Sequence, residues 1–323
     1  MTALVYLEHA DGALTDVSAQ AVALAAALGG GEVQGVVGCV DAAGAPAADA
    51  GSAGVSTLHV AADPAFATHA PLALARAVVA AVTASGAALV VGPGTESGNE
   101  VLAHVAAILD QPFAANCVSG SLTADGASVI RVRWGGSLLE EAALHGAPAI
   151  VSAQPHAVSA AAAGGGPAAT VALAAELSDA DRAVRVVERV AAAGGGLSLA
   201  DAKVVVTGGR GVGSPEGFGA LEELAGLLGG AVGCSRAVTI AGWRPHTDQV
   251  GQTGTKVAPD LYVACGVSGA TQHMAGCKGA KKILAINTDR EAPILASADY
   301  AVIGDLHEVI PAIAAELRRA RGG

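Results

Sequence analysis

The sequence predicts an α/β protein with two domains, and three observations support this fold class. Its 323 residues exceed the usual size of one domain. Apolar residues make up 52% of the chain and aromatic residues only 2%, so the cores must be built from Ala, Val, Leu and Ile. Such a composition suits buried parallel strands covered by helices. Along most of the chain, short apolar runs alternate with Ala-rich segments of helical spacing.

The first predicted domain covers residues 1–190 and is expected to be an α/β layer of the nucleotide-binding kind. Its sequence predicts strands at 4–7, 33–40, 57–60, 88–91 and 149–151, and helices at 19–28 and 72–83. The runs 116–122 and 128–134 are separated by Thr-Ala-Asp-Gly, which predicts an antiparallel pair joined by a turn. We therefore expect antiparallel strands to extend the layer.

A stretch rich in Ala and Gly at 191–199 is predicted to link the two domains. It follows a charged segment at 179–190, which is expected to be helical, and it precedes a clear strand. The second domain is therefore placed at 200–323. Residues 160–167 are also rich in Ala and Gly, and the sequence leaves open whether they form a loop or a linker.

The second domain is predicted to be a doubly wound parallel sheet, because strands and helices largely alternate. Strands are expected at 203–207, 231–234, 261–265, 282–286 and 300–303, and helices at 215–228, 270–277 and 306–317. Residues 236–259 interrupt this alternation with a long segment that contains Gly and has no strong periodicity. Long loops in compact domains are often functional.

Charge and composition exclude several classes of function. A net charge of −11 gives no electrostatic reason to bind nucleic acid or an anionic membrane. The N-terminus lacks the pattern of a signal peptide, and the apolar segments are too short to span a membrane. The five cysteines show no metal-ligand spacing, so we expect a cytoplasmic protein with free thiols. The sequence shows no nucleophile elbow and no paired catalytic carboxylates.

Polar and small residues follow the predicted strands of the second domain. In an open parallel sheet, ligands bind beyond the carboxyl ends of the strands. The segments at these positions are 208–214, 235–236, 266–273, 287–289 and 304–305, and they supply Gly, Ser, Arg, Asn and Asp. Glycine permits close backbone approach, hydroxyls donate hydrogen bonds, and a cation balances phosphate charge. This edge is therefore a candidate dinucleotide site.

Each of these motifs has a structural alternative. The glycines at 209, 211 and 213 differ from the G-x-G-x-x-G pattern, so a tight turn is as well supported as a phosphate contact. Arg210 favours the phosphate contact, although a solvated loop charge fits too. Ser268 can cap the following helix or bind a phosphate oxygen. By its position alone, His273 is predicted to be a neutral histidine that meets a backbone carbonyl. The alternative interpretation is that His273 donates a hydrogen bond to a bound ring.

The segment Gln249-Val-Gly-Gln-Thr-Gly254 lies within the long interruption. Its two glycines flank Gln252 and Thr253, so the backbone can wrap around a flat ring while the side chains reach the edge of that ring. In isolation it could equally be an ordinary polar loop. Its position between Arg236 and the 267–273 segment favours the first interpretation.

At these residues the chain closely resembles the alpha subunit of electron-transfer flavoproteins. The matching blocks are 208–211, 235–236, 249–254, 263–273, 285–287, 291–294, 298–300 and 304–306, in the order and spacing of that family. The first domain is only generically similar, through its opening Val-Tyr-Leu-Glu-His and its alternation of strands and helices.

The resemblance implies that FAD lies along the carboxyl edge of the second domain. It implies phosphate and ribityl contacts for Arg210, Ser235 and Ser268. Thr253 would lie near N5 of the flavin beside Gln252, with Arg236 over the ring and His273 near O2. Asn287 and Asp305 would hold the adenosine end. The complete implied set is Arg210, Ser235, Arg236, Gln249, Val250, Gly251, Gln252, Thr253, Gly254, Ser268, Gly269, Ala270, Thr271, Gln272, His273, Asn287, Asp305 and Leu306.

The function implied by the resemblance is electron transfer without chemistry on a metabolite. The chain would form a heterodimer with a beta subunit, accept electrons from flavin dehydrogenases and pass them to a quinone oxidoreductase. Two alternatives remain: an enzyme that binds a nucleotide cofactor with the same fold, and a nucleotide-binding regulatory module. For an enzyme, His273 and Asp305 are the nearest candidates for an acid or base.

Two departures from the family bear on redox potential and partner choice. Residues 237–240 read Ala-Val-Thr-Ile, where the family commonly has Ala-Ala-Val-Asp. Trp243-Arg-Pro-His246 is expected to add positive charge just before the 249–254 segment.

Overall fold

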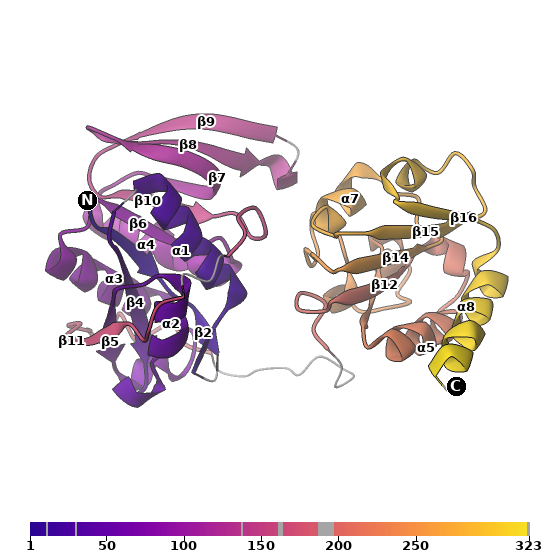
Figure 1. Ribbon diagram of the computed structural model, residues 1–323, viewed down its shortest axis with the longest axis horizontal. Helices are drawn as coiled ribbons and strands as arrows, with labels where there is room; N and C mark the ends of the chain where they lie inside the picture. The colour runs from indigo at the N-terminus through magenta and orange to yellow at the C-terminus, as the bar shows by residue number, and fades with distance from the viewer. Residues whose placement is uncertain (11, 30, 137, 161–163, 187–196, 322–323) are drawn as a thin grey trace. The chain divides into compact units, whose positions relative to one another are not determined.

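The computed structural model describes the chain except for residues 11, 30, 137, 161–163, 187–196 and 322–323. It contains two compact units, Met1–Arg189 and Val190–Gly323 (Figure 1). Most of the predicted linker at 191–199 lies outside the described residues. The boundaries of the two domains and of the linker stay predictions.

The charged segment predicted as a helix at 179–190 is not helical in its described part. Residues 179–182 form a turn, and 183–186 form a bend and an irregular segment. Asp181 accepts hydrogen bonds from the backbone N and Oγ of Ser178, and its Oδ1 lies 3.1 Å from Nε of Arg76. These contacts hold the segment against the first unit in a conformation that is not helical. The helical prediction was therefore wrong for the described residues of this segment.

The first unit contains a sheet of nine strands in the order β11-β5-β4-β1-β6-β10-β7-β8-β9. The parallel part confirms the five predicted strands, and β7 and β8 confirm the predicted antiparallel pair. The strands are β1 Ala3–Tyr6, β4 Val33–Cys39, β5 Thr57–Ala62, β6 Leu89–Pro93, β7 Phe113–Thr123, β8 Gly126–Arg133, β9 Leu138–His145, β10 Ala149–Ala153 and β11 Ala169–Leu173. A separate short hairpin joins β2 His9–Ala10 to β3 Ala13–Leu14.

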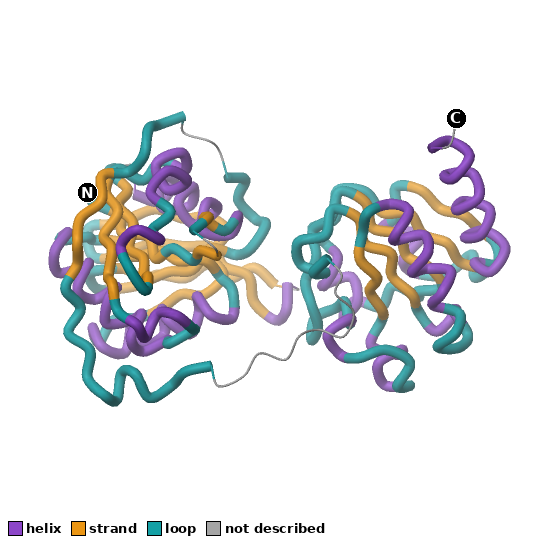
Figure 2. Tube along the Cα trace, turned by 90° about the horizontal axis from the view of Figure 1, so that it is seen from below, coloured by secondary structure: helices purple, strands orange, loops and turns teal. Residues whose placement is uncertain are grey.

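Helices cover both faces of this sheet, as Figure 2 shows. One face packs on α1 Asp16–Gly29 and α2 Ala47–Ala53, through residues such as Leu24. The other packs on α3 Pro71–Ser85 and α4 Glu96–Leu109, through residues such as Leu102. Along β1, Val5 joins the first core, while Leu4 and Tyr6 join the second. This alternation follows from the two-residue period of a strand.

The second unit contains five parallel strands in the order β13-β12-β14-β15-β16, which confirms the predicted doubly wound sheet. Its strands are β12 Val204–Gly208, β13 Ala231–Cys234, β14 Leu261–Cys265, β15 Ile283–Asn287 and β16 Tyr300–Ile303. Helices α5 Phe218–Leu228 and α8 Leu306–Arg321 lie on one face, and α7 Thr271–Cys277 lies on the other (Figure 1).

The interruption at 236–259 is more ordered than its sequence suggests. It begins with a short helix, α6 Arg236–Ile240, and later includes a single 3-10 turn at His246–Asp248. Val250 then donates its backbone N–H to the Cys234 carbonyl at 2.9 Å, so the chain returns to the end of β13. As a result, the Gln249–Gly254 segment lies at the same sheet edge as the other candidate motifs.

Candidate functional site

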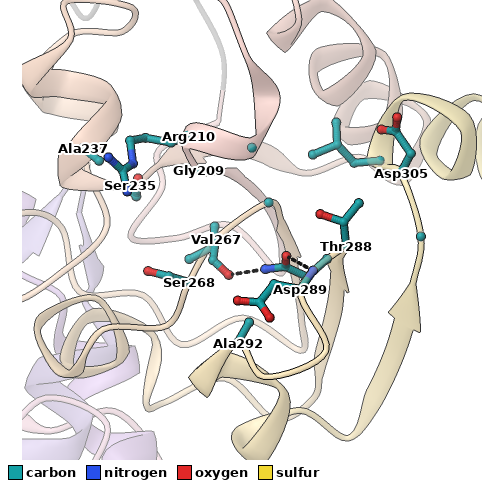
Figure 3. Close-up of a pocket in the computed structure, with 15 residues that line it drawn as sticks. Gly209, Arg210, Ser235, Ala237, Val267, Ser268, Thr288, Asp289, Ala292 and Asp305 are labelled. Carbon is teal, nitrogen blue, oxygen red and sulfur yellow. Dashed lines mark hydrogen bonds between the residues drawn. The ribbon is translucent and has the colours of Figure 1, made fainter.

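A cavity of about 260 Å³ lies at the carboxyl edge of the second sheet (Figure 3). Its walls come from the loops that follow all five strands, as the crevice rule for parallel sheets requires. The residues that line it are Gly209, Arg210, Gly211, Ser235, Ala237, Gly266, Val267, Ser268, Asn287, Thr288, Asp289, Ala292, Gly304, Asp305 and Leu306.

The glycines of the first loop are explained by contact between backbones. Gly211 donates its N–H to the Gly266 carbonyl at 3.1 Å. A Cβ placed on Gly211 would lie 2.7 Å from the Gly266 Cα, and one on Gly209 would collide with the Gly266 carbonyl. The tight-turn interpretation therefore accounts for these glycines, and their close packing forms the floor between two loops that line the cavity.

Arg210 is the one cation among the lining residues. Its side chain is exposed, and it pairs with no carboxylate among the described residues. In Figure 3 it lies beside Ser235 and Ala237. Ser235 precedes α6 without a side-chain cap, so its hydroxyl is not used by that helix. A free guanidinium beside a free hydroxyl suits a diphosphate group.

The structure does not show Ser268 capping the next helix. Helix α7 begins at Thr271 after Ala270, and no side chain caps it. Ser268 is exposed in the cavity wall, and its hydroxyl makes no hydrogen bond to the described residues. The adjoining Gly269 has a φ of +82°, and a Cβ there would lie 2.5 Å from the backbone N of Ile294. The turn before α7 therefore requires glycine at this position.

Asn287 and Asp305 organise the loops on the opposite side of the cavity. Asn287 donates from Nδ2 to the Val267 carbonyl at 2.9 Å and accepts at Oδ1 from Asp289 N at 3.0 Å (Figure 3). Asp305 accepts at Oδ1 from His307 N at 2.9 Å and so caps the start of α8. Both side chains therefore make structural contacts as well as lining the cavity.

The Gln249–Gly254 segment does not line the cavity but is tied to the start of α7. Gln252 donates its backbone N–H to the Gln272 carbonyl at 2.7 Å. The buried Gln249 side chain donates to Thr253 Oγ1 at 3.0 Å and accepts from Thr239 Oγ1 at 2.7 Å. The side chains of Gln252 and Thr253 remain exposed at the tip of the loop.

His273 is buried against this loop rather than exposed in the cavity. Only 7% of its surface is exposed, and its Nε2 lies 2.8 Å from the hydroxyl oxygen of Tyr262. Burial lowers the pKa of His273 to about 4, and the backbone of Val250 acts in the opposite direction. His273 is therefore a buried histidine whose Nε2 pairs with Tyr262, and its burial favours the neutral ring.

Two arginines near the Gln249–Gly254 loop differ in whether carboxylates balance their charge. Arg236 is exposed and has no ion-pair partner among the described residues. Arg244 was expected to add positive charge before the loop, but its NH1 lies 2.7 Å from Glu222 and its Nε 2.8 Å from Asp248. The two carboxylates balance this guanidinium, so the expectation was wrong for Arg244.

The eighteen implied cofactor residues fall into two connected groups. The cavity brings together six of them: Arg210, Ser235, Ser268, Asn287, Asp305 and Leu306. The others, Arg236, Gln249, Val250, Gly251, Gln252, Thr253, Gly254, Gly269, Ala270, Thr271, Gln272 and His273, lie on or beside the loop and α7. Thr288 and Asp289 also line the cavity, as expected from their position directly after a predicted strand, although the implied cofactor set did not include them.

A second cavity, of about 680 Å³, lies in the first unit at the carboxyl ends of β1 and β4. No Lys or Arg lines it. The Glu8 carboxyl in its wall accepts a hydrogen bond from Thr95 Oγ1 at 2.7 Å, and burial raises the pKa of Glu8. Because its wall holds Glu8 and Asp41 and no Lys or Arg, this crevice is poorly suited to a phosphate group.

The remaining observations limit the other classes of site. Among the described residues, no helix is both long and apolar enough to cross a membrane. The same part of the chain holds no cluster of three or more His, Cys, Asp or Glu side chains that could bind a metal ion. All five cysteines are buried and free. The fold and the site thus define a protein of two α/β units, the second of which has a cation-bearing crevice that suits a dinucleotide cofactor.

Comparison with known proteins assigns the family. Residues 3–178 match the electron transfer flavoprotein domain, and residues 198–278 match the electron transfer flavoprotein FAD-binding domain. The electron transfer flavoprotein subunit alpha of Paracoccus denitrificans is 38% identical over 98% of this chain and 100% of its own length. That of Mycobacterium leprae is 36% identical over 99% of both chains. That of Bacillus subtilis is 52% identical over 38% of each chain.

The chain belongs to the electron transfer flavoprotein family, as an alpha subunit, and FAD is the cofactor of its second unit. This assignment confirms the family predicted from the sequence motifs.

Proposed function

We propose that this chain forms a heterodimer with a beta subunit and carries electrons from flavin dehydrogenases to a quinone oxidoreductase. FAD supplies reversible electron acceptance when it is bound. The protein binds and orients FAD and places charge around it. None of its residues is assigned as an acid or a base for reaction with a metabolite. The observation that supports this proposal most is the convergence of Arg210, Ser235 and Ser268, all uncommitted, on one cavity at the sheet edge.

We assign the diphosphate and ribityl region to these three residues. Arg210 would neutralise phosphate charge, because it is the cation of the cavity and has no protein partner among the described residues. Ser235 and Ser268 would donate their hydroxyl protons to phosphate or ribityl oxygens. The adenosine end would meet the loops held by Asn287 and Asp305, with Leu306 and Thr288 beside them.

We assign the flavin ring to the second group of residues. Gln252 and Thr253 are exposed at the tip of the loop, where their side chains would meet the edge of a ring, and Thr253 Oγ1 accepts from Gln249 but keeps its own proton to donate. Arg236 is exposed one residue after Ser235 and would add positive charge beside the reduced ring. The remaining residues from Gln249 to Gly254 and from Gly269 to His273 would shape the backbone around the ring.

His273 would affect the flavin without touching it, because its side chain is buried and hydrogen-bonded to Tyr262. A direct contact with flavin O2 would require a buried ring nitrogen to become exposed, because Nε2 is hydrogen-bonded to Tyr262 and Nδ1 is buried as well. We therefore propose that His273 affects the flavin through the position of the loop. A cytoplasmic location stays a prediction from composition.

The electron path can be tested with purified partners. The chain is coexpressed with the beta subunit from its source, and the complex is mixed anaerobically with an acyl-CoA dehydrogenase reduced by its own substrate. We expect the flavin absorbance of the complex to fall and then to recover on addition of a quinone oxidoreductase. Absence of a complex, or of reduction by both acyl-CoA and amine dehydrogenases, would contradict the proposal.

A further inference from the structure

A hydroxyl on the short helix α6 reaches the buried base of the Gln249–Gly254 loop. Thr239 Oγ1 lies 2.7 Å from Gln249 Oε1, and it also lies 2.9 Å from the carbonyl oxygen of Arg236, one turn earlier in the helix. The flavoproteins that this chain resembles commonly have valine at this position, within their Ala-Ala-Val-Asp sequence. The contact between Thr239 and Gln249 is therefore a feature of this chain and does not follow from the resemblance.

Gln249 connects Thr239 to the tip of the loop. Its side chain is buried, with 3% of the residue exposed, and its Nε2 donates to Thr253 Oγ1 at 3.0 Å. Thr253 itself is exposed. The two hydroxyls and the amide between them thus form one chain of hydrogen bonds, which runs from α6 to the residue proposed to lie nearest the flavin ring.

The backbone of Gln249 has little room to move, so this chain of hydrogen bonds depends on the side chain. The backbone N–H donates to the His246 carbonyl at 3.0 Å, and the carbonyl accepts from Thr255 N at 2.7 Å. A Cβ on Gly254 would lie 2.2 Å from the Gln249 carbonyl oxygen, so the loop closes tightly over it. With the backbone held in this way, the two hydroxyls set the direction of the amide.

Both hydrogen bonds of the amide persist whichever way its nitrogen and oxygen point. In the structure, Thr239 donates to Oε1, and Nε2 donates to Thr253. With the amide turned over, Nε2 donates to Thr239, whose own proton goes to the Arg236 carbonyl, and Thr253 donates to Oε1. Because a hydroxyl can donate or accept, the link between α6 and the loop tip is the same in both arrangements.

Removal of the Thr239 hydroxyl would leave one end of a buried amide without its partner. An unpaired buried polar group is costly, so the amide would turn towards water to recover a partner. That rotation would break the contact between Gln249 and Thr253 Oγ1. The Thr253 side chain would then lose a hydrogen bond that orients it at the loop tip.

We propose that Thr239 is a positioning residue for the cofactor loop: through the buried amide of Gln249, its hydroxyl holds the Thr253 side chain in place at the loop tip. This inference rests on the proposed function only in so far as Thr253 contacts FAD. The chain of hydrogen bonds is a property of the protein itself.

The test compares Thr239→Val with Thr239→Ser and Thr247→Val in the complex of this chain and its beta subunit. Valine keeps the shape of threonine and removes the hydroxyl, whereas serine keeps the hydroxyl. Thr247 is exposed, and its Oγ1 lies 3.4 Å from Asp248 Oδ1, so Thr247→Val is the matched control.

Hydrogen–deuterium exchange of residues 249–255 is measured on the complex stripped of FAD, and FAD release is measured on the loaded complex. We expect both to be about tenfold faster in Thr239→Val than in the wild type, because the loop has lost a restraining hydrogen bond. Thr239→Ser and Thr247→Val should match the wild type in both measurements. Thr239→Ala removes the same hydroxyl and should repeat the result of Thr239→Val, which keeps the test decisive if either variant fails to fold.

Three results would overturn the proposal. Exchange in 249–255 that is unchanged by Thr239→Val would show that the hydroxyl does not restrain the loop. Faster exchange with an unchanged rate of FAD release would show a purely structural role, and loss of both wild-type rates in Thr239→Ser would show that the hydroxyl is not the cause. A wild-type complex that binds no FAD would instead contradict the proposed function, and the exchange measurement would still decide whether Thr239 holds the loop.

Discussion

Gly211 and Gly266 bring two loops of the second sheet together through their backbones. Gly211 N donates to Gly266 O at 3.1 Å, and the same contact leaves no room for a Cβ on Gly211. One loop carries Arg210 and the other carries Ser268. The positions of these two side chains therefore depend on glycine for reasons of chain packing, and a ligand is not needed to explain the glycines.

Gly269→Ala should destabilise the second unit. Its φ of +82° disfavours an L-residue, and the new Cβ would lie 2.5 Å from Ile294 N. We expect the free energy of unfolding to fall by roughly 2–4 kcal/mol. Gly226→Ala is the control, because Gly226 lies inside α5 with open space around it, and this change should raise stability by roughly 0.5–1 kcal/mol. Urea unfolding measures both, and equal effects would refute the argument.

Arg210→Gln should weaken FAD binding by about 10- to 100-fold, because it removes a charge-assisted contact to phosphate. Fluorescence titration of FAD-free complex measures the dissociation constant. Arg321→Gln removes an exposed cation from the last turn of α8 and should leave FAD affinity unchanged. An Arg210→Gln complex with wild-type affinity would remove this residue from the site.

Arg236→Ala should lower the reduction potential of the flavin. Reduction adds negative charge to the ring, and the exposed, unpaired guanidinium would stabilise that charge. Anaerobic potentiometry measures the shift, which should shrink as ionic strength rises. Arg244→Ala provides the comparison, since Glu222 and Asp248 already balance that cation. A potential unchanged by Arg236→Ala would leave this arginine with no electrostatic role.

Stability should depend on the protonation of His273. Its pKa is about 4 in the folded chain and 6.5 in the unfolded one, so the unfolded state binds the proton more tightly. The stabilisation is complete above pH 6.5 and is lost as pH falls from 6.5 towards 4, by about 3 kcal/mol at most. His273→Gln should flatten this part of the stability curve, whereas the exposed His307→Gln should not. Denaturant unfolding between pH 7 and pH 4 tests this directly.

The regular parts of the second unit were predicted well from sequence. Strands β13, β14 and β16 begin and end at the predicted residues, because each is an apolar run bounded by polar or small residues. Helix α4 was missed because it begins Glu-Ser-Gly-Asn and shows little periodicity in its first turn, where Thr95 supplies the cap. Strand β9 was also missed, because its Leu-Leu-Glu-Glu opening gives no clean alternation.

The sequence predicted residues that line the site, but it did not predict which side chains pair with one another. Six of the implied cofactor residues follow the ends of strands, and these six line one cavity. By contrast, the pairing of Arg244 with Glu222 and the bond between His273 and Tyr262 join different elements, and no local pattern reports them. The first contact balances the charge of Arg244 beside the Gln249–Gly254 loop, and the second fixes where the His273 ring lies, so these features needed the structure.

The proposed function requires FAD to lie along the carboxyl edge of the second sheet. Hydrogen–deuterium exchange of the complex with and without FAD tests it most directly. We predict slower exchange on FAD binding in the segments 208–212, 250–254, 266–272 and 304–308, with no change around the acidic cavity at Glu8. Protection confined to the first unit, or absent from the 208–212 and 266–272 loops, would contradict this account.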